Sequence, residues 1–146
     1  MSTTTSAGIA RAYIEAVGSH DLKTVDGLLA DSLEARVGAG ASDKQQWMSA
    51  LERLLPALVR NDIRDVYENG DHACVVYDFV TDTPAEAGPP SPVPDEPRSG
   101  SVGRAIGIVC VENVHVADGR ITDIELVFDK VAFASVNEAL KARALA

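Results

Sequence analysis

The amino-acid sequence predicts a single α+β domain in which helices cover one face of a mostly antiparallel sheet. Three observations indicate this class. Apolar residues recur at steps of three and four over the first part of the chain, up to about residue 58, which is typical of helices. Beyond that point the period changes to two, which is typical of strands. These strands come in consecutive pairs joined by short turns, and a run of hairpins forms an antiparallel sheet.

The first two helices are expected at the N-terminus. One spans residues 6–17 and ends at Gly18, because glycine is common just past a helix end. Asp21 is expected to cap a second helix. The apolar faces of the two helices comprise Ile9, Tyr13, Ala16 and Val17 in the first and Leu22, Val25, Leu28 and Leu29 in the second.

A short strand over residues 31–37 is expected next, followed by a third helix. Ser42 is expected to open this helix, with Asp43 favourable in its first turn. Pro56 removes one backbone hydrogen bond and is expected to kink the helix or end it. The apolar side of this helix comprises Trp47, Leu51, Leu54, Leu55 and Leu58.

Four strands and a helical tail complete the chain. The turn signals Asn69-Gly70-Asp71 and Ala117-Asp118-Gly119 each join two strands into a hairpin. The last helix is expected in the alanine-rich tail, residues 132–146. The four strands are expected over residues 63–67, 72–81, 104–116 and 120–128.

Residues 83–103 separate the two hairpins and contain six of the seven prolines. Proline excludes both a helix and a central strand, so this segment is expected to be an extended or disordered loop. Two interpretations stay open. The loop is either a tolerated insertion or a lid over a pocket.

The composition is that of one folded domain. The chain has 146 residues, 46% of them hydrophobic and 24% charged, and a chain of this length needs no disulfide or metal to fold. A net charge of −9 argues against nucleic acid and anionic membrane as partners. No apolar run reaches the roughly 18 residues of a membrane span, and residues 1–6 lack the pattern of a signal peptide. The cytoplasm is therefore the expected location, and Cys74 and Cys110 are expected to be buried free thiols.

Three local patterns occur together with this order of elements. They are residues 13–31, residues 77–84 (beginning Tyr77-Asp78-Phe79) and residues 114–129 (beginning Val114-His115-Val116). Together they resemble the nuclear transport factor 2-like superfamily, in its SnoaL-like polyketide cyclase and ketosteroid isomerase branch. The superfamily also includes scytalone dehydratases and limonene epoxide hydrolases. The resemblance implies a cone-shaped domain with three N-terminal helices on a curved sheet that encloses an apolar pocket, and a homodimer formed through the sheet.

The resemblance also implies site residues. Tyr13 matches the tyrosine of the isomerase oxyanion-binding pair, and Glu112 falls where that pair has an aspartic acid. Val37 stands where isomerases have their catalytic aspartate, and Leu126 where SnoaL-like cyclases have theirs. The main proton carrier of either family is therefore not preserved.

Glu112 is the sharpest catalytic candidate, because it interrupts a nearly continuous apolar strand. A three-residue turn would pair Glu112 with Ile124 and place it on an apolar face, whereas a two-residue turn would pair it with Glu125 on a polar face. An apolar setting raises the pKa of a carboxyl group, so Glu112 could donate a proton near neutral pH. The apolar face, a predicted substrate-binding wall, comprises Cys110, Val114, Ile124, Leu126 and Phe128 around Glu112.

Tyr77 and Asp78 are neighbours on one strand, so only one of them faces inward. Ala73, Val75, Tyr77 and Phe79 form the more continuous inward set, which favours Tyr77 as a substrate-binding residue and Asp78 outside. Asp78 inside would be a second carboxyl group, so it is the provisional base. Trp47 is expected to be a core residue that can also contact the substrate.

Two functional hypotheses follow. The first is a cofactor-independent enzyme of secondary metabolism, with Glu112, Tyr13 and Asp78 as catalytic residues and an apolar, oxygenated small molecule as substrate. Its reaction would be isomerisation, cyclisation, dehydration or epoxide opening. The second is a non-catalytic domain of the same fold that binds a hydrophobic ligand or another protein. No metal is expected, because the three histidines are scattered and lack partners at ligand spacing.

Overall fold

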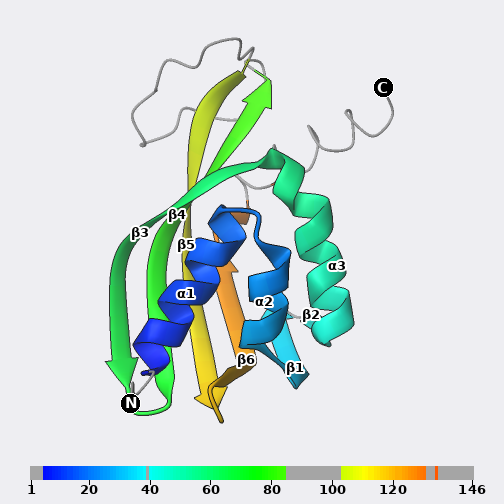
Figure 1. Cartoon of the computed structure of the whole chain (residues 1–146). Helices are drawn as coiled ribbons and strands as arrows, with labels where there is room; N and C mark the ends of the chain where they lie inside the picture. The colour runs from blue at the N-terminus through cyan, green and yellow to red at the C-terminus, as the bar shows by residue number, and fades with distance from the viewer. Residues whose placement is uncertain (1–4, 39, 85–102, 131–133, 135–146) are drawn as a thin grey trace.

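The structure, a computed structural model, describes residues 5–38, 40–84, 103–130 and 134. A six-stranded sheet forms one layer and three helices form the other (Figure 1). The strands are β1 (Leu29–Val37), β2 (Gly40–Ser42), β3 (Leu58–Asn69), β4 (His72–Pro84), β5 (Gly103–Ala117) and β6 (Arg120–Phe128). Their order across the sheet is β2-β1-β6-β5-β4-β3, and every pair is antiparallel except β1 with β6. The predicted α+β class and mostly antiparallel sheet are confirmed.

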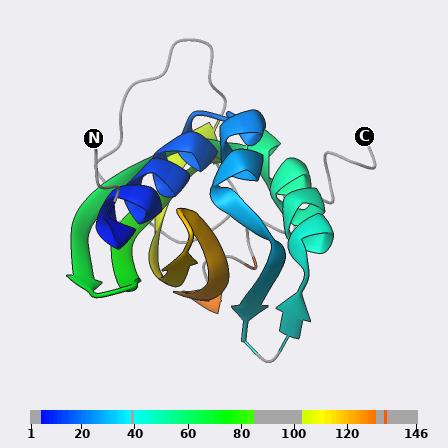
Figure 2. The ribbon, with the colours of Figure 1, turned by 60° about the horizontal axis from the view of Figure 1, so that its bottom comes forward.

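The sheet curves beneath the helices (Figure 2), and we call the face that they cover the inner face. Helix α1 (Ser6–Gly18) packs mainly on β3 and β4, whereas α3 (Lys44–Leu54) packs on β1. Between them lies α2 (Leu22–Leu28). No helix among the described residues is long and apolar enough to cross a membrane.

The first two helices begin and end close to the predicted positions. The hydroxyl of Thr5 accepts a hydrogen bond from the backbone N–H of Gly8 and caps α1, and the side chain of Asp21 caps α2 as expected. His20, between the helices, has a φ of 63°, which turns the chain sharply.

The third helix is shorter than the sequence predicted at both ends. Ser42 belongs to β2, and Asp43 is the cap itself, in a reciprocal capping box with Gln46. The helix ends at Leu54, and Pro56 lies in a single 3-10 turn (Leu55–Ala57). Leu58, predicted to belong to the helix, begins β3 instead, because Pro56 has no backbone N–H with which to continue the helical hydrogen bonding.

Strand β3 is longer than the predicted strand over residues 63–67. It is an edge strand, so its N-terminal half includes polar residues such as Asn61 and Asp62 that disguise the alternation of a strand. The predicted loop over residues 83–103 and the predicted helical tail fall mostly outside the described residues. The ends of that loop extend β4 to Pro84 and start β5 at Gly103.

The hairpin of β5 and β6 has a different register from either predicted one. A two-residue turn, Asp118-Gly119, pairs Ala117 with Arg120, and both turn residues have positive φ. One extra residue, Thr122, then shifts the register, so that Glu112 lies opposite Leu126. The pairing of Glu112 with Ile124 is thus wrong, but a shift of two residues leaves Glu112 on its predicted face.

Candidate functional site

Glu112 lies on the inner face of β5 and is only 2% exposed. Its neighbours across the sheet are Val75 on β4 and Leu126 on β6. Val37 on β1 is the next residue in the same row, because it pairs with Leu126. The two positions at which the resemblance implies an aspartate, Leu126 and Val37, are therefore one and two strands away from Glu112 in this row, and here both side chains are apolar.

Two tyrosines interact with this carboxyl group, and Trp47 is hydrogen-bonded to one of them. We call the four side chains the Glu112 cluster: Tyr13, Trp47, Tyr77 and Glu112. The hydroxyl of Tyr77 donates a hydrogen bond of 2.7 Å to Oε1 of Glu112. The indole N–H of Trp47 donates a hydrogen bond of 2.9 Å to the hydroxyl oxygen of Tyr13. Tyr13 in turn interacts electrostatically with Glu112. All four side chains are buried, and they come from α1, α3, β4 and β5.

Burial sets the protonation of the cluster. It raises the pKa of Glu112 from 4.5 to about 7, although the hydroxyls of Tyr77 and Tyr13 favour the charged form and oppose this change. Burial, with the charge of Glu112 as a second cause, raises the pKa values of Tyr13 and Tyr77 well above 10. Near neutral pH both phenols keep their protons, and Glu112 is present in both its acid and its carboxylate form.

The second carboxyl oxygen of Glu112, Oε2, is buried and has no hydrogen-bond partner among the described residues. A buried polar atom without a partner costs about 1–3 kcal/mol, so such atoms often mark sites with a ligand role. In the acid form Oε2 can donate a proton, and in the carboxylate form it can accept one.

The predicted wall residues lie on the face that the sequence assigned to them. Cys110, Val114 and Ile124 are buried, and Leu126 and Phe128 pack partly buried against them. Burial raises the pKa of the Cys110 thiol to about 12, and its sulfur is hydrogen-bonded to the carbonyl of Ile108, so the thiol is not a nucleophile.

Asp78 is not part of the Glu112 cluster, which corrects its provisional role as a base beside Glu112. Tyr77 faces inward, so the alternation of the strand turns Asp78 to the outer face. There both carboxylate oxygens accept hydrogen bonds from the Arg64 guanidinium, at 2.9 and 2.8 Å. Asp78 is therefore bound by Arg64 on the face of the sheet opposite to Glu112.

The sequence named Trp47 and Tyr77 as substrate contacts, and that role stays a prediction. What it missed is that each donates a hydrogen bond inside the cluster, Trp47 to Tyr13 and Tyr77 to Glu112. The members of these pairs lie 34 and 35 residues apart in the chain, and no local pattern reveals such pairs.

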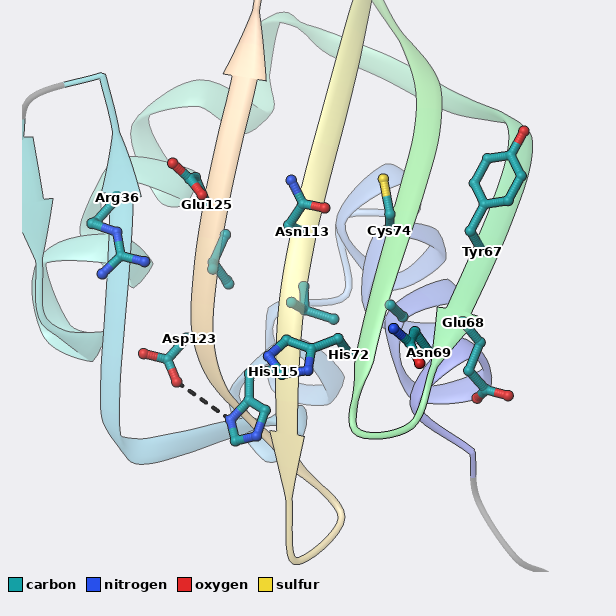
Figure 3. Close-up of a pocket in the computed structure, with 13 residues that line it drawn as sticks. Arg36, Tyr67, Glu68, Asn69, His72, Cys74, Asn113, His115, Asp123 and Glu125 are labelled. Atoms are coloured by element: carbon teal, nitrogen blue, oxygen red, sulfur yellow. Dashed lines mark ion pairs between the residues drawn. The ribbon is translucent and has the colours of Figure 1, made fainter.

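A groove of about 550 Å³ lies on the outer face, not beside Glu112 (Figure 3). Most of the residues that line it have polar or charged side chains, and Ala73, Val114 and Ile124 also contribute. His115 is 3.5 Å from the carboxylate of Asp123, and its ring is 4.7 Å from that of His72. The sequence placed His115, Asp123, Asn113 and Glu125 on one face but did not predict a groove. The enclosed apolar pocket around Glu112 stays a prediction. In residues 5–38, 40–84 and 103–130, no three His, Cys, Asp or Glu side chains are arranged to hold a metal ion.

Comparisons with known proteins agree with this architecture. A family model of the SnoaL-like domain matches residues 10–124. Among solved structures, IdmH from Streptomyces antibioticus, a proposed polyketide cyclase, has a TM-score of 0.69 at 18% identity, over 90% of this chain and 98% of its own. An LEH-like epoxide hydrolase of M. tuberculosis has a TM-score of 0.65 at 18% identity, over 98% of this chain and 97% of its own. At these identities the likeness shows the fold. A search of curated protein sequences finds no match.

Proposed function

The chain belongs to the SnoaL-like family of the nuclear transport factor 2-like superfamily, and from this premise we propose that it is a cofactor-independent acid–base enzyme acting on an apolar, oxygen-bearing small molecule. The observation that supports this most is Glu112. It is a buried carboxyl group with a pKa of about 7, one hydrogen-bonded oxygen and one oxygen without a partner among the described residues. General acids and bases work best when their pKa lies near the working pH.

The number of carboxyl groups favours some reactions over others. Glu112 and Asp78 are the buried carboxyl groups among the described residues, and Asp78 forms an ion pair with Arg64 on the outer face. Hydrolytic epoxide opening needs one group to activate water and another to protonate the epoxide oxygen. An isomerisation or an aldol-type cyclisation can use a single carboxylate, which takes a proton from a carbon next to a carbonyl and returns it at the end of the reaction. We therefore place proton-shuttling isomerisation or cyclisation ahead of hydrolysis.

In this reaction Glu112 would transfer the proton and Tyr13 would donate a hydrogen bond to the substrate oxygen. Tyr13 suits that role because its oxygen already accepts a hydrogen bond from Trp47, which leaves its own O–H as the group to donate. The apolar residues Val37, Val75 and Leu126 would exclude water from the carboxyl group.

The test is Glu112→Gln, which keeps the shape of the side chain and removes its proton transfer. Wild type and variant would be assayed with a β,γ-unsaturated ketone, an aromatic poly-β-ketone and a hydrophobic epoxide. We expect the substrate that wild type converts to lose about 10²- to 10⁴-fold in kcat. Glu125→Gln, an exposed carboxyl group on the outer face of β6, is the matched control and should leave kcat unchanged. Full activity of folded Glu112→Gln would remove Glu112 from the mechanism.

The second candidate is a non-catalytic domain that binds a hydrophobic ligand or a protein. The close packing of the inner face around Glu112, with the groove on the opposite side, favours it. It predicts no turnover of any of the three substrates by wild type, together with saturable binding of at least one of them in calorimetry.

We also propose that the chain forms a homodimer through the outer face of its sheet. Members of the family commonly pair in this way. Three large apolar side chains are exposed on strands of the sheet: Tyr67 (59%), Val109 (36%) and Val127 (56%).

A further inference from the structure

The two oxygens of a protonated carboxyl group differ, because one bears the proton and donates while the other accepts. In Glu112 they also have different surroundings. Oε1 is 2.7 Å from the hydroxyl of Tyr77, and Oε2 has no partner among the described residues. Glu112 can donate its proton to a ligand only from the oxygen that bears it.

The direction of the Tyr77 hydrogen bond follows from the partners available to its proton. When Glu112 is a carboxylate, Tyr77 is the donor, since its phenol stays protonated. If protonated Glu112 instead donated from Oε1, Tyr77 would need another acceptor for its own proton. Its other polar neighbours in the described chain are the thiol of Cys110, whose sulfur is a weak acceptor, and the hydroxyl of Tyr13, whose oxygen already accepts a hydrogen bond from Trp47. Tyr77 is therefore best satisfied as a donor to Oε1 in both forms of Glu112.

We infer that Tyr77 is a positioning residue that keeps the acidic proton of Glu112 on Oε2, the oxygen free to meet a ligand. The catalytic meaning of this inference rests on the proposed function, but the position of the proton does not. Without Tyr77 the proton would exchange between the two oxygens, and only one of these arrangements would present it to a ligand.

Infrared spectroscopy of the carboxylic acid group tests this without a substrate. The C=O stretch of Glu112 at pH 5 is isolated as the difference between wild type and Glu112→Gln. A C=O that accepts a hydrogen bond absorbs at lower frequency than a free one. We expect a lowered C=O frequency in wild type that rises in Tyr77→Phe, which loses only the hydroxyl. Tyr67→Phe removes the hydroxyl of the exposed tyrosine on β3 and should leave the band in place.

A second readout is the midpoint of Glu112 ionisation, followed by NMR of ¹³C-labelled glutamate carboxyl groups. The Tyr77 hydroxyl lowers the pKa of Glu112, so its removal should move the midpoint upward from about 7, by about one pH unit. In an active enzyme, the midpoint in the pH profile of kcat/KM that reports the ionisation of Glu112 should move in the same direction, with a several-fold loss in kcat. A merely structural role for Tyr77 would lower activity without moving this midpoint.

Two results would overturn the inference. One is a wild-type C=O band already at the frequency of a free acid, because the proton would then lie on Oε1; this spectrum decides the question even if Tyr77→Phe does not fold. The other is a midpoint that is the same in wild type and folded Tyr77→Phe. If no variant turns over any substrate but the band and the midpoint move as expected, the proposed function fails and the position of the proton stands.

Discussion

Glu112 makes the stability of the protein depend on pH. Its pKa is about 7 in the folded protein, whereas an unfolded chain leaves it near 4.5. The folded state therefore holds the proton more tightly than the unfolded state. The contribution of this group to stability is fully present below pH 4.5 and is lost as the pH rises through about 7.

The expected size of this loss is about 3 kcal/mol between pH 4.5 and pH 8. Glu112→Gln cannot ionise, so its free energy of unfolding should fall less than that of wild type over this range. Urea unfolding of both proteins at several pH values measures the difference. Parallel stability curves would show that the folded protein does not raise the pKa of Glu112. Glu125→Gln should follow the wild-type curve, because its side chain is exposed.

At the scale of the elements, the hairpin of β5 and β6 decides the direction of Glu112. Its two-residue turn alone would have placed Glu112 opposite Glu125 and on the polar face. The extra residue Thr122 restores the parity, so the apolar residues of both strands face the helices. Burial of one face therefore selects the register, and the bulge at Thr122 makes this register compatible with the two-residue turn.

Alanine substitutions at two glycines test the effect of backbone conformation without a change in packing, because both glycines have open space around them. Gly119 has a φ of 75° in the turn, whereas Gly27 lies inside α2, and a Cβ at either position would meet no atom within 4 Å. Gly119→Ala should lower the free energy of unfolding by about 1 kcal/mol, because a side chain disfavours positive φ. Gly27→Ala should raise it by about 0.5–1 kcal/mol, because alanine favours the helix. Thermal or urea unfolding measures both, and effects of the same sign would contradict this account.

At the scale of the whole molecule, the two faces of the sheet have different roles. The inner face packs against the helices and holds the Glu112 cluster, whereas the outer face exposes valines and contains the groove. Val76, Val111 and Val127 form one row across three strands of that face. An apolar row of this kind fits the proposed homodimer.

Val127→Arg tests the homodimer. A charge placed in the row should convert a dimer of wild type into a monomer, because an unpaired charge is costly to bury. Analytical ultracentrifugation measures the mass of each. Ser49→Arg places the same charge on the exposed side of α3 and should leave the mass unchanged. A monomeric wild type at tens of micromolar would contradict the proposal.

The sequence by itself determined the fold class, the cap of α2, and the inward face of Cys110, Glu112, Val114, Ile124 and Tyr77. These features are local. Periods of 3.6 and 2 depend on neighbouring residues, and the facing of a side chain depends only on parity, so it survived an error of two residues in the register of Glu112. The extent of β3 was less predictable, since polar residues on an edge strand hide its alternation.

Only the tertiary structure decided which side chains meet. The packing of two helices on two strands brings Tyr13 to Trp47 and Tyr77 to Glu112. Arg64, on a neighbouring strand, binds the carboxylate of Asp78. A hydrogen bond depends on distance and direction to within tenths of an ångström, which no spacing along the chain specifies. The same holds for the pKa of Glu112, which depends on its burial between β4 and β6 under the helices.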